Sequence, residues 1–182
     1  LQSNFATLLM TVGEAEHAIA QYRDLIRRAE NHENYSAQQM LTGLKYNLAR
    51  ALVSANPAHD PEEIGSLYLS AVNDARETMG NTNPNTFVIE RRYALWLHEQ
   101  KRLEESQALF LDLMSRAHTS IGPQHPLAMS NALHLADVEL ALGNIESARS
   151  LALETLKHLE ESGQNLPATY EHAQTILTTI SN

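Results

Sequence analysis

The stretch Gly80-Asn81-Thr82-Asn83-Pro84 is followed 42 residues later by Gly122-Pro123-Gln124-His125-Pro126 (122 − 80 = 42). After each copy an apolar pattern with helical spacing continues for about four turns until a short polar break. A second helical pattern then opens at Leu103-Glu104 in one copy and at Ile145-Glu146 in the other. A fixed period of roughly 20–50 residues is typical of a solenoid, in which stacked helix pairs share one continuous core.

The composition describes a folded, acidic chain. Of its 182 residues 43% are apolar and 19% are charged, and 22 acidic against 13 basic side chains give a net charge of −9. An excess of negative charge disfavours direct binding of nucleic acid, whose phosphates attract clustered Lys and Arg. No apolar run reaches the ~18–20 residues of a membrane span. Cysteine is absent, which excludes a disulfide framework and fits a reducing compartment, so we expect a cytoplasmic protein without membrane contact.

Proline and glycine fall between the helical patterns, where turns and first helical positions are expected. No segment shows the alternation and β-branched enrichment of a strand. The sequence therefore predicts an all-α fold with nine helices, over residues 1–11, 14–31, 35–55, 61–79, 85–99, 103–120, 126–142, 144–162 and 167–180.

A packing pattern recurs inside the helix pairs. In the first helix of a pair a large residue precedes a small one, which lets the second helix approach closely, and a bulky residue of the second helix fills the space between neighbouring pairs. The large-small pairs are Leu48-Ala49, Tyr93-Ala94 and Leu135-Ala136, and the equivalent second-helix positions are Tyr22, Tyr68, Phe110 and Ala152.

This pattern resembles the tetratricopeptide repeat (TPR), most clearly in Leu135-Ala136, Gly143-Asn144 and Ala148. The 42-residue length, the element at 122–126 and the segment Asn47-Leu48-Ala49 are similar to the longer subclass found in kinesin light chains and many bacterial signalling proteins. The resemblance implies a right-handed superhelix (α-solenoid) of antiparallel helix pairs. The departures from the pattern are the missing His in the stretch 80–84, and Ile64, Ser106 and Glu139.

We predict a single repeat domain over residues 1–182, with units at about 1–31, 35–79, 85–120 and 126–162 and a capping helix at 167–180. The chain begins inside its opening helix, which suggests a segment excised from a longer protein. An uncovered apolar face there (Phe5, Leu8, Leu9) would permit a homodimer through the N-terminal end. At the other end the capping residues are Tyr170, Ile176, Leu177 and Ile180, and the outer wall is expected to be solvated at Asp112, Arg116, Glu154 and Glu161.

The resemblance implies that the first helix of each pair lines a concave groove that binds extended peptides or partner helices. The residue before each large-small pair should point into it, and one turn further the same face carries a second row. With Arg91, the neighbour of Arg92, the expected groove residues are Asn47, Arg50, Arg91, Arg92, Leu95, His134 and Asp137.

Three arginines make the centre of this groove basic. Arg offers a planar fork that fits a carboxylate, and Asn pairs with the backbone of an extended peptide. We therefore expect a protein or peptide partner that presents an acidic segment or a C-terminal carboxylate. In the alternative interpretation, the arginines form ion pairs with Glu90, Glu99 or Asp137 of the chain itself.

No metal site, cofactor or catalytic centre is expected. The nine His residues are scattered, and none of them forms the i, i+4 pair that places two imidazoles on one helical face. His125, in a Gly-Pro loop at a helix start, is interpreted as a turn or capping residue. Glycine-rich phosphate loops and nucleophile motifs are absent from the sequence, so we predict that the chain is not an enzyme.

The sequence thus predicts a peptide-binding interaction module within a signalling or regulatory protein. The alternative is a ligand-responsive sensor domain, in which a small molecule in the groove changes the pitch of the solenoid and controls an attached effector such as a transcriptional regulator or a kinase.

Overall fold

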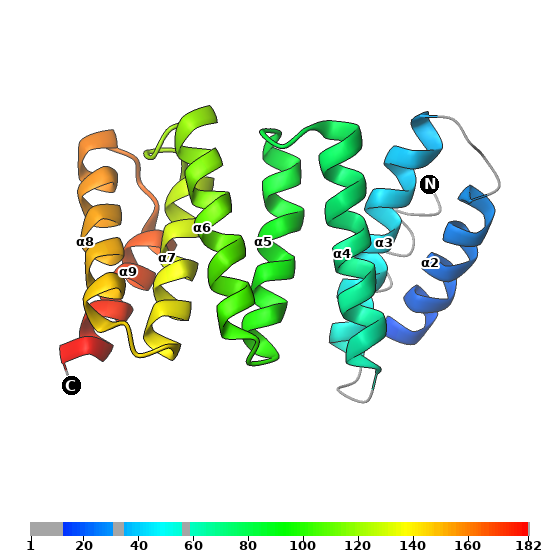
Figure 1. Cartoon of the computed structure of the whole chain (residues 1–182), viewed down its shortest axis with the longest axis horizontal. Helices are drawn as coiled ribbons and strands as arrows, with labels where there is room; N and C mark the ends of the chain where they lie inside the picture. Colours follow the sequence, from blue (N-terminus) through cyan, green and yellow to red (C-terminus); the bar gives the residue numbers. More distant parts are fainter. Residues whose placement is uncertain (1–12, 31–34, 56–58, 182) are drawn as a thin grey trace. The chain divides into compact units, whose positions relative to one another are not determined.

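A computed structural model describes residues 13–30, 35–55 and 59–181, and these residues form eight helices and no strand (Figure 1). The all-α prediction is confirmed, and the observed helices begin and end within two residues of the predicted ones. The first predicted helix, 1–11, lies outside the described residues together with Phe5, Leu8 and Leu9. The helices are α2 (Ala15–Ala29), α3 (Tyr35–Ala55), α4 (Pro61–Met79), α5 (Pro84–Glu99), α6 (Leu103–Ser120), α7 (Pro126–Ala141), α8 (Ile145–Ser162) and α9 (Pro167–Ser181).

The chain divides into two compact units, Leu1–Ile89 and Glu90–Asn182, so that the boundary falls within α5. In the first unit α3 packs between α2 and α4. In the second unit α7 packs against α6, α8 and α9, and α8 also contacts α9. Each unit is thus built from neighbouring helices that are consecutive or nearly consecutive in the chain.

The repeated small residues are the closest-packed points of the core. Ala49, Ala94 and Ala136 are completely buried, as are Tyr68 and Phe110, and Tyr22 is 1% exposed. The predicted packing role of these positions is therefore confirmed. Because a large buried side chain leaves a cavity when it is truncated, we expect Phe110→Ala to cost about 3–5 kcal/mol of stability.

The two turns that opened the sequence comparison have the same backbone geometry. Gly80 and Gly122 have φ of +93° and +85°, values that favour glycine. In each turn the amide of the residue three positions later donates to the glycine carbonyl, Asn83 at 3.3 Å and His125 at 3.2 Å. Asn83 Oδ1 then accepts from the amide of Asn85 at 2.9 Å, and His125 Nδ1 accepts from that of Leu127 at 3.1 Å. Asn83 therefore caps its helix as His125 does, which explains how the first copy functions without the His.

Two other departures from the repeat pattern are buried polar residues with partners. Ser106, fully buried, donates from its hydroxyl to the carbonyl of Ala94 at 2.7 Å, which ties α6 to α5. Glu139, 5% exposed, accepts from Gln107 Nε2 at 3.0 Å and from Asn144 Nδ2 at 2.6 Å. These hydrogen bonds satisfy groups that would otherwise cost free energy on burial.

Helix α9 closes the second unit. Its Ala173 and Ile176 join a buried cluster with Leu133, Ala136 and neighbouring alanines, and Leu177 and Ile180 pack against that cluster. The predicted capping role is correct for these residues and wrong for Tyr170, whose side chain is 51% exposed. Tyr170 stands on the first turn of α9, before the face that meets the cluster, and lines a surface pocket instead.

Candidate binding face

In the first unit, Asn47 is half-buried and Arg50 is exposed, and both lie on α3 as expected. The Arg50 guanidinium carbon lies 5.5 Å from the centre of the Tyr46 ring, a cation–π arrangement one helical turn apart. Nearby, Lys45 Nζ on α3 contacts Asp74 Oδ2 on α4 at 2.7 Å and Ser70 Oγ at 2.9 Å. The polar face of α3 is therefore anchored to the second helix of its pair.

In the second unit, the expected residues lie on α5 and α7 with intermediate exposure: Arg91, Arg92, Leu95, His134 and Asp137. Partial burial is what a lined groove requires, because fully exposed side chains would cover no surface and fully buried ones would reach no ligand.

A hydrogen bond connects the polar faces of α5 and α7. Arg91 Nη1 donates to Ser130 Oγ at 3.1 Å, and Arg92 Nη1 donates to Glu99 Oε1 at 3.3 Å within α5. The second contact is one of the ion pairs of the alternative interpretation. Asn47 and Arg50 belong to the other compact unit, so a single groove that contains all seven residues remains a prediction.

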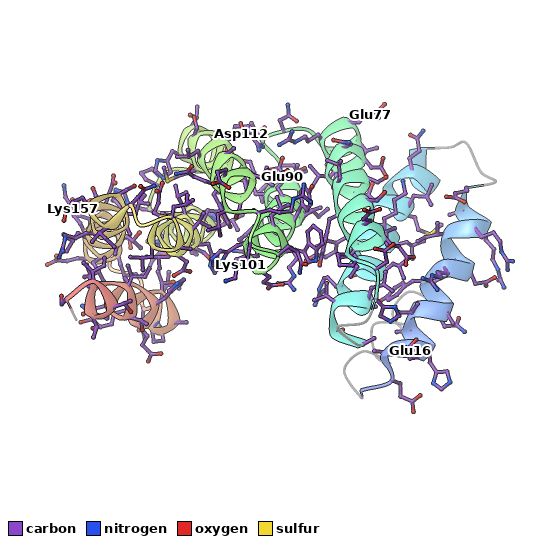
Figure 2. All side chains as sticks on the ribbon, turned by 60° about the horizontal axis from the view of Figure 1, so that its bottom comes forward. Glu16, Glu77, Glu90, Lys101, Asp112 and Lys157 are labelled. Carbon is purple, nitrogen blue, oxygen red and sulfur yellow. The ribbon has the colours of Figure 1, made fainter. Side chains whose placement is uncertain are left out.

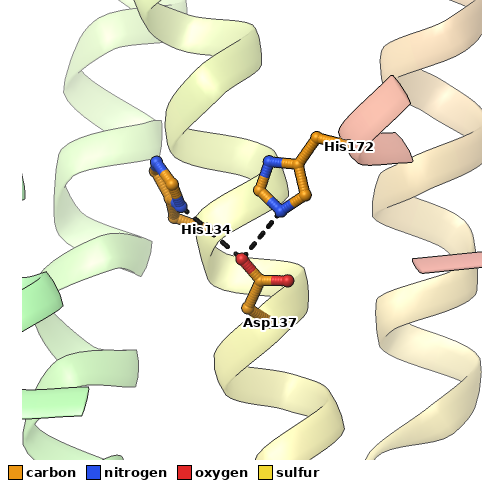
Figure 3. Close-up of side chains that lie close together, drawn as sticks. All are labelled: His134, Asp137 and His172. Atoms are coloured by element: carbon orange, nitrogen blue, oxygen red, sulfur yellow. Dashed lines mark hydrogen bonds and ion pairs between the residues drawn. The ribbon is translucent and has the colours of Figure 1, made fainter. Parts of the chain in front are cut away.

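The predicted residues His134 and Asp137 form a cluster with a third residue that the sequence did not identify. His172 Nε2 of α9 lies 2.8 Å from Asp137 Oδ2, and His134 Nδ1 lies 3.5 Å from the same oxygen (Figure 3). The rings of His134 and His172 are 5.3 Å apart, and that of Phe110 is 6.1 Å from His134. The three side chains retain 25–31% exposure, so the cluster is accessible from solvent.

The charges of this cluster stabilise one another. The hydrogen bond to Asp137 raises the pKa of His172 above its usual value, against the opposing effect of burial. For Asp137 burial is the largest single influence and acts to raise the pKa, but the hydrogen bonds from His134 and His172 outweigh it and lower the pKa. Asp137 is therefore held as a carboxylate between two imidazoles.

His172 was missed because the sequence search covered His pairs within one helix. The two His residues are 38 positions apart (172 − 134 = 38) and come from different helices. The expectation of no metal site depended on that search, and the cluster of His134, Asp137 and His172 has the groups that hold a metal ion.

Arg116 differs from its expected place on a solvated outer wall. Its side chain is 18% exposed and contacts Glu90 Oε2 of α5, which is fully buried, at 2.8 Å. It also contacts Asp112 Oδ2 at 2.8 Å on its own helix. Figure 2 labels Glu90 on α5 and Asp112 on α6, the two acidic partners of this guanidinium. The pair joins α5 to α6 and has a structural role.

The largest described pocket, about 530 Å³, lies at the turn from α8 to α9. Its lining includes Leu156, Leu159, Gln164 and Tyr170. A second, narrow pocket lies between α6, α7 and α8 and is lined by His118 and His158 among others. Neither contains any of the predicted groove residues.

Consecutive helix pairs that share a repeated packing pattern and end in a single covering helix define an α-solenoid. The comparisons with known proteins agree. A family model described as "Tetratricopeptide repeat" matches residues 85–161. Those residues belong to the tetratricopeptide repeat family, and the chain has a tetratricopeptide-type fold, as the sequence resemblance implied.

Solved structures match the chain over almost its whole length. BtubC (BKLC) from P. vanneervenii has a TM-score of 0.81 and 17% sequence identity, over 98% of this chain and 70% of that chain. A Podospora anserina protein described as a kinesin light chain with nearly identical TPR-like repeats has a TM-score of 0.75 and 15% identity, over 99% and 92% of the two chains. A second crystal structure of the latter kind has a TM-score of 0.78 at 15% identity, over 99% and 91%. No curated protein sequence matches significantly.

The tetratricopeptide fold supports a role as a protein-interaction module. Across residues 13–30, 35–55 and 59–181, every helix is too short or too polar to cross a membrane.

Proposed function

We propose that this chain binds a protein or peptide partner through the polar face of its first helices, as the interaction module of a cytoplasmic signalling or regulatory protein. The observation that carries the proposal is the hydrogen bond from Arg91 on α5 to Ser130 on α7, 3.1 Å long. It connects the first helices of two successive pairs at the height of the predicted groove residues. A ligand that runs along this face would contact both helices.

The chemistry of the face favours an acidic ligand. Arg91 and Arg92 are half-buried, so their aliphatic stems are fixed while their guanidinium groups remain within reach of solvent. An acidic side chain or a C-terminal carboxylate would replace Glu99 as the partner of Arg92, or add to it, through a two-pronged interaction. On the α7 part of the face, the Asp137 charge is offset by its contacts with the two imidazoles. The α5 arginines therefore dominate the electrostatics of this face.

The sensor hypothesis predicts an enclosed pocket at Asn47, Arg92 and His134. The pockets described above are lined by other residues, and no observation favours this alternative. We therefore retain the interaction module.

Fluorescence polarisation with a library of Asp/Glu-rich peptides, each made with a free and with an amidated C-terminus, tests the proposal. The double variant Arg91→Ala/Arg92→Ala should weaken binding at least about tenfold, because each lost charge-assisted contact costs about 1.5–3 kcal/mol. The matched control is Arg149→Ala/Lys157→Ala, which removes the same charge from α8. Amidation should weaken binding only if the terminal carboxylate is recognised. Equal binding by the wild type and the α5 double variant would eliminate the basic-face proposal.

A further inference from the structure

We propose that His134, Asp137 and His172 form a binding site for one divalent transition-metal ion, with Zn²⁺ as the expected ion, and that the ion fastens α9 to α7. This site is independent of the proposed partner binding, since it needs no partner to be observed.

The three side chains supply a suitable set of ligands. Zn²⁺ is bound by imidazole nitrogen and carboxylate oxygen, often by three protein groups with a fourth position open to water. The chain contains no cysteine, so a thiolate site cannot compete for the ion. Two imidazoles and one carboxylate favour Zn²⁺, Ni²⁺ or Cu²⁺ over Ca²⁺ and Mg²⁺, which prefer oxygen ligands.

The distances are close to those of a loaded site. One ligand atom from each residue lies within 4.8 Å of the other two. With metal–ligand bonds of about 2.0–2.1 Å, the ligand atoms of a tetrahedral Zn²⁺ site lie about 3.4 Å apart. His134 Nδ1 is already 3.5 Å from Asp137 Oδ2, whereas His172 Nε2 is 2.8 Å from it. Loading the ion requires His172 to withdraw by only about half an ångström from the carboxylate.

The ligands stand on packed helices. Each lies one position from a member of the buried cluster, since His134 follows Leu133, Asp137 follows Ala136 and His172 precedes Ala173. Figure 3 shows His172 reaching from α9 toward the two α7 residues. A site built on two packed helices keeps its geometry better than one on loops. It also gives a metal ion a mechanical consequence, because the bonds cross from the capping helix to the repeat beneath it.

The competing interpretation is a hydrogen-bonded triad that binds no metal. The two interpretations differ for His172→Gln. A glutamine amide can still donate a hydrogen bond to Asp137, but it is a poor zinc ligand. A second His-containing region provides the matched control: His158 on α8 contacts Glu154 at a distance of 3.9 Å, and His158→Gln removes an imidazole outside the proposed site.

The experiment uses the whole chain without a polyhistidine tag, stripped with a chelator, in competition with a chromophoric chelator for Zn²⁺. The wild type and His158→Gln should bind one Zn²⁺ per chain with equal affinity. His134→Gln and His172→Gln should bind at least about tenfold more weakly, at the low end of what even supporting residues of metal sites contribute. Circular dichroism verifies that each variant is folded.

Hydrogen exchange provides a second readout, which reports the connection between the helices. Zn²⁺ should slow amide exchange in α9 of the wild type and leave α9 of His172→Gln unchanged. The proposal is overturned if the tag-free wild type does not bind Zn²⁺ at about 100 μM, weaker than any structural or catalytic zinc site. It is equally overturned if His172→Gln binds as the wild type does, or if His158→Gln loses binding to the same extent.

Discussion

Lys101 occupies, in a left-handed backbone conformation with φ of +62°, the position that Gly143 takes one repeat later with φ of +82° (143 − 101 = 42). The hydrogen bonds around the two residues are equivalent. The amide of Lys101 donates to the carbonyl of His98 at 3.0 Å, and that of Gly143 to Leu140 at 3.0 Å. The next amide, of Arg102 or Asn144, donates to the carbonyl five residues before it, at 2.9 or 2.8 Å. This is the double bond pattern of a helix end that favours glycine.

Lys101→Gly should therefore stabilise the protein. The left-handed conformation costs a non-glycine residue about 1–2 kcal/mol, and the greater freedom of glycine in the unfolded chain offsets about 0.5–1 kcal/mol of that gain. We expect a net increase of about 0.5–1 kcal/mol in the free energy of unfolding, measured by chemical denaturation. Lys157→Gly, inside α8, should lower it by about 1 kcal/mol. Destabilisation by both changes would show that the turn is not strained by Lys101.

The equivalence of Asn83 and His125 predicts that one can replace the other. Asn83→Ala removes the acceptor for the Asn85 amide and should cost about 1 kcal/mol. Asn83→His should restore most of that loss, because His125 caps the next unit in the same way. Thr82→Ala, beside the cap, should change stability by less than about 0.5 kcal/mol. If the His variant were as unstable as the Ala variant, the two turns would not be interchangeable.

Loss of the Arg116 guanidinium should be the most costly of these changes. Arg116→Met keeps much of the side-chain volume but removes a charge next to the fully buried Glu90, and removal of one partner of a buried ion pair costs about 3–5 kcal/mol. The deficit should shrink in acid, where the variant can protonate Glu90. Thermal unfolding at several pH values measures both effects, with Arg149→Ala as the surface control. A cost below about 1 kcal/mol would place this ion pair among ordinary surface pairs.

His118 should make stability depend on pH. Burial lowers its pKa below the usual 6.5, partly opposed by the charge of Glu154 and reinforced by His158. As the pH falls through 6.5 toward the lower native value, the unfolded chain takes up a proton that the native protein does not, so this residue reduces stability in acid. His118→Gln should lose less stability between pH 7.5 and 5 than the wild type. Parallel pH curves for the two proteins would contradict this prediction.

The candidate face was only partly predictable. Asn47, Arg92 and His134 were selected by register, and the structure places them on first helices with intermediate exposure, as predicted. The partners of these residues were not predictable to the same degree. The Arg92–Glu99 contact lies within one helix and was among the alternatives, whereas the contacts of Arg91 with Ser130 and of Asp137 with His172 join different helices.

The sequence by itself determined the helices, their repeat and their buried positions. A period of 3.6 residues identifies the buried face of each helix, and a 42-residue period aligns those faces, so Ala94, Ala136 and Phe110 were identified from spacing alone. Only the tertiary structure decided which polar side chains meet, since residues 26 positions apart (116 − 90) or 38 apart (172 − 134) are brought together by the packing of whole helices. Local periodicity carries no information about that packing, and the Glu90–Arg116 pair and the cluster of His134, Asp137 and His172 follow from it.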